Sequence, residues 1–333
     1  MRDDVKRWLA SASSVADDWP LDTLQARKGD TTVSVVLPAL NEGETVGTIV
    51  ELIRASLMDD DTPLVNELVV LDSGSTDDTA RRAESAGATV LHRDDVLPGF
   101  VPTVGKGEAM WRAVAATHGD IVVFIDADLR SFTPTYVSGL LGPLFANPDV
   151  QLVKAVYERP YVDGDTVVAA GGGRVTELVA RPLLNLHWPE LSGVIQPLAG
   201  EYAARRTLLE RVSFPCGYGV ELALLIDTLD LYGLDAIAQV DLGVRVHRHH
   251  DERKLGRMAA QIMRTAMVRL ERSGRAQLHH ELGTTLDQFE RSAGGFTTKT
   301  HTVSGHERPP LVDVAEYAGA GTGTRAERSP TSD

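Results

Sequence analysis

The chain has 333 residues, of which 43% are hydrophobic and 24% are charged, and its formal net charge is −14. This composition is typical of a globular protein with one large or two smaller α/β domains. The acidic balance argues against a protein that binds duplex nucleic acid, because such a protein needs a basic face. Cys216 is the single cysteine, so an intrachain disulfide and a multi-cysteine zinc site are excluded.

The sequence also argues against a membrane protein. Its N-terminal residues lack the long apolar region of a signal peptide. No run approaches the roughly 18 apolar residues that a transmembrane helix needs. We therefore expect a cytoplasmic protein without stable membrane insertion.

The first 130 residues alternate between strand and helix patterns. Residues 1–30 are polar and helix-like, and we expect them to cover an edge of the core. Apolar, mostly β-branched runs then predict four strands, and periodic segments predict the helices between them. The strands are expected at 33–37, 67–71, 88–91 and 121–125, with helices around 49–57, from 79 onward and at 106–116. This alternation predicts βαβ units and a mainly parallel sheet.

The second half contains longer apolar stretches. Strands are expected at 150–157 and 239–246, a short strand near 203, and helices at 178–184, 222–231 and 257–275. The last of these helices is amphipathic, which fits packing against the core or against a second subunit. The segment 291–333 is polar, and it shows no periodicity from about residue 297, which predicts a disordered tail.

Two carboxylates follow the apolar run 121–125. On an extended backbone, Asp126 and Asp128 point to the same side, with small Ala127 between them. Two anions held this close repel each other, so the pattern favours a shared divalent cation such as Mg²⁺. The same residues also fit a solvated loop or a helix N-cap.

Two further segments of the first half are suited to binding a nucleotide or a phosphate. Residues 72–75, Asp-Ser-Gly-Ser, lie between a strand and a helix, where a doubly wound sheet places nucleotide contacts, although they serve equally well as helix caps. Lys106 lies between two glycines at a helix start, which suits a phosphate or a sugar hydroxyl. The spacing is not that of a P-loop, so an ATPase is excluded.

The second half offers an anion site and a histidine cluster. Three glycines at 171–173 precede Arg174 and Thr176 at a helix start, a combination that suits phosphate or carboxylate but also a plain turn. Glu221 begins the next apolar helix, where it favours the helix dipole or faces a sugar hydroxyl. Residues 245–250, Arg-Val-His-Arg-His-His, could supply a metal ligand or form a solvated basic edge.

Taken together, these motifs resemble a known family. Pro-Ala-Leu-Asn-Glu, Asp-Ser-Gly-Ser, Gly-Lys-Gly-Glu and Asp-Ala-Asp, in this order, resemble GT-A glycosyltransferases. In the second half, Gly-Gly-Gly-Arg-Val-Thr-Glu-Leu, Pro-Leu-Ala-Gly-Glu-Tyr, Gly-Tyr-Gly-Val-Glu and Arg-Val-His-Arg resemble the glucosyl-3-phosphoglycerate synthases of family GT81. The similarity spans about residues 30–275.

The resemblance implies an α/β GT-A fold with a C-terminal acceptor-binding part, and a homodimer. It implies transfer of glucose from UDP-glucose, or another nucleoside diphosphate glucose, to D-3-phosphoglycerate with retention and with Mg²⁺ or Mn²⁺ as cofactor. The product would serve glucosylglycerate and methylglucose lipopolysaccharide synthesis. The implied parts are an N-terminal helical segment (1–30), a nucleotide-sugar-binding Rossmann-like half (31–130), an acceptor-binding half with a dimerisation helix (131–290) and the tail (291–333).

The resemblance also assigns residue roles. Donor contacts fall on Pro38, Ala39, Leu40, Glu42, Asp72, Ser73, Lys106, Asp126, Ala127, Tyr218, Glu221 and Arg245. Acceptor contacts fall on Gly173, Arg174, Thr176 and His249, the last standing where the family has asparagine. The metal ligands are Asp126, Asp128 and His247, and the catalytic residues are Asp128, Lys106 and Glu221.

Three alternatives remain open on the sequence. Mannosyl-3-phosphoglycerate synthesis from GDP-mannose would use the same fold. Transfer to polyprenyl phosphate is weakened by the lack of a basic amphipathic helix. A non-catalytic regulator that binds nucleotide sugars would not need the metal residues and Lys106.

Overall fold

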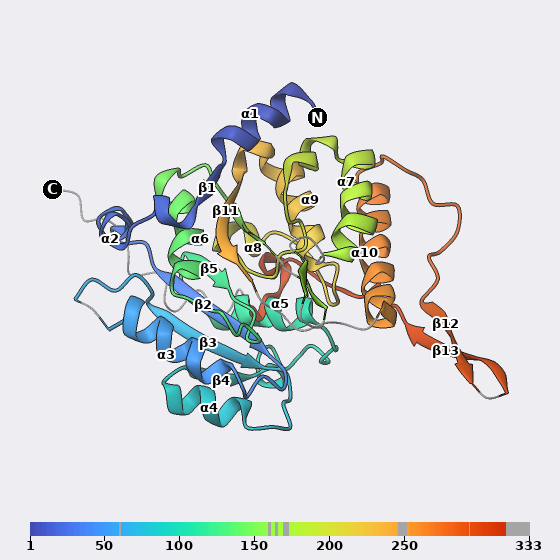
Figure 1. The fold of residues 1–333 in the computed structure, drawn as a ribbon, viewed down its shortest axis with the longest axis horizontal. Helices are drawn as coiled ribbons and strands as arrows, with labels where there is room; N and C mark the ends of the chain where they lie inside the picture. The colour runs from blue at the N-terminus through green and yellow to red at the C-terminus, as the bar shows by residue number, and fades with distance from the viewer. Residues whose placement is uncertain are drawn as a thin grey trace.

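The computed structural model describes residues 1–59, 61–158, 161–163, 166–168, 173–245, 252–292 and 294–317. Its centre is an eight-stranded sheet with the order β1-β11-β6-β9-β5-β2-β3-β4, flanked by helices (Figure 1). Neighbouring strands are parallel, except that β9 runs antiparallel to both β5 and β6. The predicted α/β fold with a mainly parallel sheet is therefore confirmed.

The first half folds as its alternating pattern predicts. Each predicted strand and helix is present, with ends shifted by a few residues at most. The strands are β2 (Val33–Ala39), β3 (Glu67–Asp72), β4 (Thr89–His92) and β5 (Ile121–Phe124), and the helices are α3 (Val46–Leu57), α4 (Thr79–Ala86) and α5 (Lys106–Ala116). Because these four strands are parallel, their carboxyl ends lie at the same edge of the sheet.

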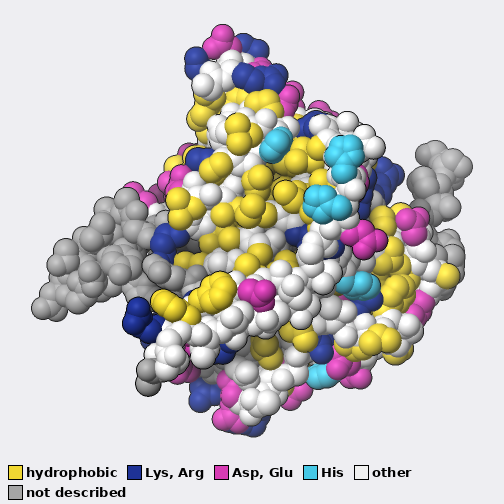
Figure 2. Space-filling view, turned by 90° about the vertical axis from the view of Figure 1, so that its right-hand side faces the viewer, with side chains coloured by type: hydrophobic (Ala, Val, Ile, Leu, Met, Phe, Trp, Pro, Cys, Tyr) yellow, Lys and Arg dark blue, Asp and Glu magenta, His cyan; other side chains and the backbone are white. Residues whose placement is uncertain are grey.

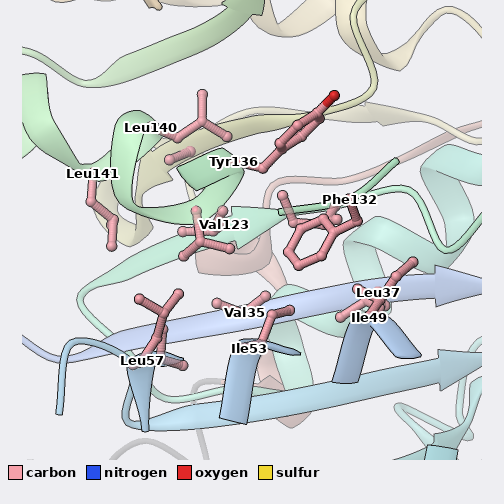
Figure 3. Packing of buried hydrophobic residues seen from close by; sticks show 14 of the residues in the cluster. Val35, Leu37, Ile49, Ile53, Leu57, Val123, Phe132, Tyr136, Leu140 and Leu141 are labelled. Carbon is pink, nitrogen blue, oxygen red and sulfur yellow. The ribbon is translucent and has the colours of Figure 1, made fainter. Parts of the chain in front are cut away.

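Both faces of the sheet are covered by apolar side chains. Val35 and Leu37 belong to one buried cluster, while Val36, on the opposite face, belongs to the other. The first cluster packs the sheet against α3 and α6 (Thr135–Ala146). Figure 3 shows this packing, with Ile49, Ile53 and Leu57 of α3 facing the strands. The continuous apolar runs of the sequence thus become strands that are buried on both faces.

The N-terminal segment contributes more than the predicted helices. α1 (Asp3–Ser11) buries Val5 and Trp8, and α2 (Leu21–Lys28) buries Leu24. Between them, β1 (Ser13–Val15) pairs with β11 and forms the edge strand of the sheet. A strand of three residues, two of them serines, is too short to show apolar alternation, so the sequence pattern did not reveal it.

The second half completes the sheet and adds helices on its other face. Its elements are β6 (Leu152–Glu158), β7 (Tyr161–Asp163), β8 (Thr166–Val168), a π-helical turn (Thr176–Ala180), α7 (Arg181–His187), β9 (Tyr202–Arg205), α8 (Arg206–Leu209), β10 (Phe214–Pro215), α9 (Val220–Tyr232), β11 (Ile237–Val244) and α10 (Glu252–Arg272). Buried residues of α7, α9 and α10 share one cluster with α5. The described part of the chain has no helix long and apolar enough to cross a membrane.

The prediction of a disordered tail from residue 291 is wrong for the residues described up to 317. β12 (Thr285–Ser292) and β13 (Gly295–Thr302) form a hairpin that projects from the body (Figure 1), and β14 (Glu307–Arg308) pairs with β10. Arg308 is buried and donates hydrogen bonds to the buried Glu108 carboxylate. This long-range pairing orders a segment that has no local periodicity. Residues 318–333 of the predicted tail lie outside the described residues.

Candidate active site

A cavity of about 680 Å³ lies at the carboxyl-terminal edge of the parallel strands. Its size is within the range of small-molecule sites, roughly 300–1,000 Å³. Its lining includes most of the residues that the sequence singled out, drawn from widely separated segments. These are Pro38, Ala39, Leu40, Glu42, Ser73, Lys106, Asp126, Ala127, Asp128, Gly173, Arg174, Thr176, Tyr218, Glu221 and Arg245.

Lys106, the first residue of α5, lies between two carboxylates. Its Nζ is 2.7 Å from an oxygen of Asp126 and 3.0 Å from an oxygen of Glu221. Burial lowers the pKa of Lys106, but Asp126 and Glu221 outweigh this and hold the pKa well above its ordinary value. Lys106 therefore remains a cation at neutral pH.

Arg245, just beyond β11, contacts both aspartates of the Asp-Ala-Asp motif. Its Nη2 is 3.1 Å from an oxygen of Asp126 and 3.2 Å from an oxygen of Asp128. Burial raises the pKa of Asp126, but Lys106 and Arg245 reverse this and lower it below its usual range. Asp126 is thus ionised, and the two carboxylates are close enough to share one cation.

Two buried residues that sequence reasoning missed hold the other side of Arg245. Glu201 is fully buried, and its carboxylate accepts hydrogen bonds from the Tyr157 hydroxyl at 2.7 Å and from Arg245 Nη1 at 3.0 Å. Arg245 Nη1 also donates to the Tyr157 hydroxyl at 2.8 Å. The signal in the sequence was a glutamate inside Pro-Leu-Ala-Gly-Glu-Tyr, where an apolar strand begins.

Glycines allow this cluster to pack closely. A Cβ at Gly200 would clash with the Asp126 carboxylate and the Lys106 ammonium. A Cβ at Gly105 or Gly107 would clash with the backbone carbonyls of Cys216 and Pro215. The glycines around Lys106 thus permit a close approach of two backbone segments.

The residues of the first half that are predicted to contact the donor do not all line the cavity. Pro38, Ala39, Leu40, Glu42 and Ser73 line the cavity. Asp72 is not among the lining residues, because its buried carboxylate accepts hydrogen bonds from the backbone N–H groups of residues 74 and 75. Through these hydrogen bonds, the Asp72 carboxylate shapes the loop that presents Ser73.

On the opposite side of the cavity, Arg174 and Thr176 lie at the start of the π-helical turn. One face of α10 joins them, with Lys254, Met258 and Gln261 at helical spacing. The Gln261 side-chain oxygen accepts a hydrogen bond from the backbone N–H of Tyr218 at 2.8 Å. The sequence predicted this helix at 257–275 but not that one of its faces would line the cavity.

The predicted metal ligand His247 and acceptor residue His249 lie outside the described residues. Within the described part of the chain, no group of three or more His, Cys, Asp or Glu side chains is placed to hold a metal ion. The predicted third metal ligand therefore remains a prediction.

A mainly parallel sheet with paired carboxylates and cations at its carboxyl-terminal edge fits the GT-A glycosyltransferase fold, and comparison with known proteins assigns the chain to this class. Residues 34–196 match the family model for Glycosyl transferase family 2. The glucosyl-3-phosphoglycerate synthase of Mycolicibacterium smegmatis is 50% identical over 92% of this chain and 98% of its own length. The corresponding enzyme of Petrotoga mobilis is 41% identical over 87% and 89%. The chain belongs to the glucosyl-3-phosphoglycerate synthase family.

Solved structures agree with this assignment. The glucosyl-3-phosphoglycerate synthase of Mycobacterium tuberculosis, in complex with Mn²⁺, UDP-glucose and phosphoglyceric acid, is 48% identical with a TM-score of 0.78, covering 88% of this chain and 95% of that one. The mannosyl-3-phosphoglycerate synthase of Rubrobacter xylanophilus is 40% identical with a TM-score of 0.85, covering 93% and 99%.

Proposed function

We propose that this protein transfers glucose from UDP-glucose to D-3-phosphoglycerate, with retention of anomeric configuration, and releases UDP. The M. tuberculosis relative that binds UDP-glucose and phosphoglyceric acid together carries this proposal. The cavity supports it, because the predicted donor residues of the first half and Arg174 and Thr176 of the second face one space. We also propose a cytoplasmic location, which fits the free thiol of Cys216.

A divalent cation, Mg²⁺ or Mn²⁺, completes the proposed site. The residues fit such an ion, because Asp126 and Asp128 already share the guanidinium of Arg245 as a stand-in cation. Asp126, Asp128 and the predicted His247 would hold the metal, and oxygen and imidazole donors suit it. When bound, the metal supplies charge neutralisation for the diphosphate leaving group.

The chain's own residues account for the rest of the chemistry. Lys106 places a permanent positive charge beside the site of the leaving diphosphate, which stabilises the charge that develops there. Arg174 and Thr176 offer a guanidinium and a hydroxyl to the anionic acceptor. Glu221 forms an ion pair with Lys106. No carboxylate can be singled out from the sequence as a covalent nucleophile, so we favour front-face attack of the acceptor hydroxyl, with the leaving phosphate as base, over a glycosyl-Glu221 intermediate.

Mannosyl transfer from GDP-mannose is the second candidate. It is supported by the R. xylanophilus mannosyl-3-phosphoglycerate synthase, whose TM-score of 0.85 exceeds the 0.78 of the M. tuberculosis complex. The higher sequence identity to the glucosyl enzymes, 50% against 40%, favours glucose.

The deciding experiment measures nucleoside diphosphate release. Each of UDP-glucose and GDP-mannose is incubated with and without D-3-phosphoglycerate, first with Mg²⁺ and then with EDTA. We expect UDP release that requires both acceptor and metal. Preferential GDP release would replace the glucosyl by the mannosyl function, and turnover without the acceptor would contradict both.

The same reaction tests the proposed chemistry. We expect a product with the anomeric configuration of the donor and an unmodified enzyme by intact-protein mass spectrometry. A trapped sugar adduct on Glu221 would contradict front-face attack.

A further inference from the structure

The Arg245 guanidinium occupies the place between the two aspartates of the proposed metal site. One amino group, Nη2, lies within 3.2 Å of an oxygen of each carboxylate. The side chain is only 7% exposed, and Asp128 is the more accessible aspartate at 41%. A guanidinium that bridges two carboxylates neutralises their mutual repulsion while no metal is bound.

The opposite side of the guanidinium is fixed independently of the aspartates. Nη1 contacts the Tyr157 hydroxyl and the Glu201 carboxylate, and the guanidinium lies 5.3 Å from the centre of the Tyr157 ring. Arg245 Nε is buried and has no hydrogen-bond partner among the described residues. Arg245 therefore has a fixed anchor on one side and a donor group on the other that can exchange partners.

From this geometry we infer that Arg245 is a resident counter-cation that the divalent metal displaces from Asp126 and Asp128. Once displaced, it turns Nη2 towards the nucleotide diphosphate while Glu201 and Tyr157 keep its anchor. The inference rests on the proposed function for the identity of the metal and the diphosphate. Glu201 and Tyr157 act as positioning residues in this exchange.

The displacement has a thermodynamic consequence that can be measured without turnover. In the wild type, the metal must displace the Arg245 guanidinium from Asp126 and Asp128. After this displacement, the positive charge of Arg245 still repels the metal at short range. Removal of the guanidinium should therefore tighten metal binding. Charge-assisted contacts of this kind are strong enough for a change on the order of tenfold.

The test is a Mn²⁺ titration of metal-free enzyme, in which electron paramagnetic resonance measures the concentration of free Mn²⁺. For Arg245→Gln we expect a Mn²⁺ Kd about tenfold below that of the wild type. UDP should tighten Mn²⁺ binding by a larger factor in the wild type than in Arg245→Gln, because only the wild type gains an arginine–diphosphate contact. Weaker or unchanged Mn²⁺ binding in the variant would overturn the inference.

Two further variants keep the test decisive. Arg206→Gln is the matched control, since Arg206 is a buried arginine whose partners are two backbone carbonyls and the hydroxyl of Thr117, away from the cavity. It should lower thermal stability without changing Mn²⁺ affinity. If Arg245→Gln fails to fold, Arg245→Met replaces it, because it also removes the positive charge, and a Kd at or above the wild-type value overturns the inference.

The outcome is separable from that of the proposed function. Absence of glycosyl transfer to D-3-phosphoglycerate, together with the expected change in Mn²⁺ affinity, would refute the acceptor and support the counter-cation. Normal transfer together with unchanged Mn²⁺ affinity in Arg245→Gln would support the acceptor and refute the counter-cation.

Discussion

The buried Lys154 has different neighbours from Lys106 and Arg245, two cations of the site. Its Nζ donates to the backbone carbonyl of Ala199 at 2.6 Å and lies 4.6 Å from the centre of the Tyr202 ring. The side chain is 1% exposed, and burial is the main cause that lowers the pKa of Lys154 to about 8. Lys106, which touches two carboxylates, has the opposite shift.

This depressed pKa predicts a pH-dependent stability. Between pH 8 and about 10.5 the unfolded lysine binds a proton that the folded one has released, so the free energy of unfolding rises with pH over this window. The rise attributable to Lys154 is at most about 3 kcal/mol. In Lys154→Met this component should be missing, which urea unfolding at several pH values measures.

The exposed Lys6 provides the matched control, and Lys6→Met should follow the wild-type pH dependence. Parallel curves for wild type and Lys154→Met would show that Lys154 does not titrate in this range.

At the scale of single residues, the sequence revealed groups whose chemistry is tied to a local pattern. Asp126 and Lys106 were found because one follows an apolar strand and the other stands between glycines at a helix start. Glu201, Tyr157 and Lys154 were missed because their roles depend on burial and on pairing between β6 and β9. Contacts of this kind join residues far apart in the chain, so they leave no pattern in the sequence.

At the scale of elements, the segment that follows the hairpin is tied to the helix that carries Lys106. Arg308 of β14 contacts the fully buried Glu108 of α5 and lies beside the rings of Phe100 and Trp111, at 5.5 and 5.4 Å from their centres. Glu108 also pairs with the buried Arg112. β14 thereby supplies a second cation to the buried Glu108 carboxylate in the first turn of α5.

We predict that Arg308→Met costs about 3 kcal/mol of unfolding free energy, because it leaves the buried Glu108 carboxylate with Arg112 as its one charged partner among the described residues. Urea unfolding measures this cost. The double variant Glu108→Gln, Arg308→Met should lose less than the sum of the single variants.

Arg81→Met is the control, because the Arg81–Asp78 pair is exposed and screened by water, so its loss should leave the free energy of unfolding nearly unchanged. An Arg308→Met variant as stable as this control would contradict the role of β14.

The elements that the sequence predicted are those with strong local periodicity. α5 was predicted with its observed ends, and β5 to within one residue. The short strands β1, β10 and β14 were missed, since two or three residues give no period. β12 and β13 were also missed, because their mixture of Thr, Lys and Glu lacks the apolar alternation of a strand packed on a core.

At the scale of the whole molecule, exposed apolar residues lie on α7, on α10 and on both strands of the hairpin. Figure 2 shows the side of the molecule that lies to the right in Figure 1, where hydrophobic side chains gather. Leu186 of α7 is 75% exposed, Met263 of α10 is 44% exposed, and Phe289 and Phe296 of the hairpin are 65% and 68% exposed. An isolated two-stranded hairpin is marginal in water, which favours a covering partner for β12 and β13.

We predict that a second copy of the chain covers this face, as expected for a homodimer. The double variant Phe289→Ser, Phe296→Ser should shift the mass in solution from twice that of one chain towards the monomer, because it removes apolar area from the hairpin. Multi-angle light scattering over a range of concentrations measures the shift. Val15→Ser, an exposed apolar position on the edge strand β1, is the control and should remain dimeric. A monomeric wild type would contradict the dimer. A double variant that stays dimeric would show that the dimer contact does not depend on the hairpin.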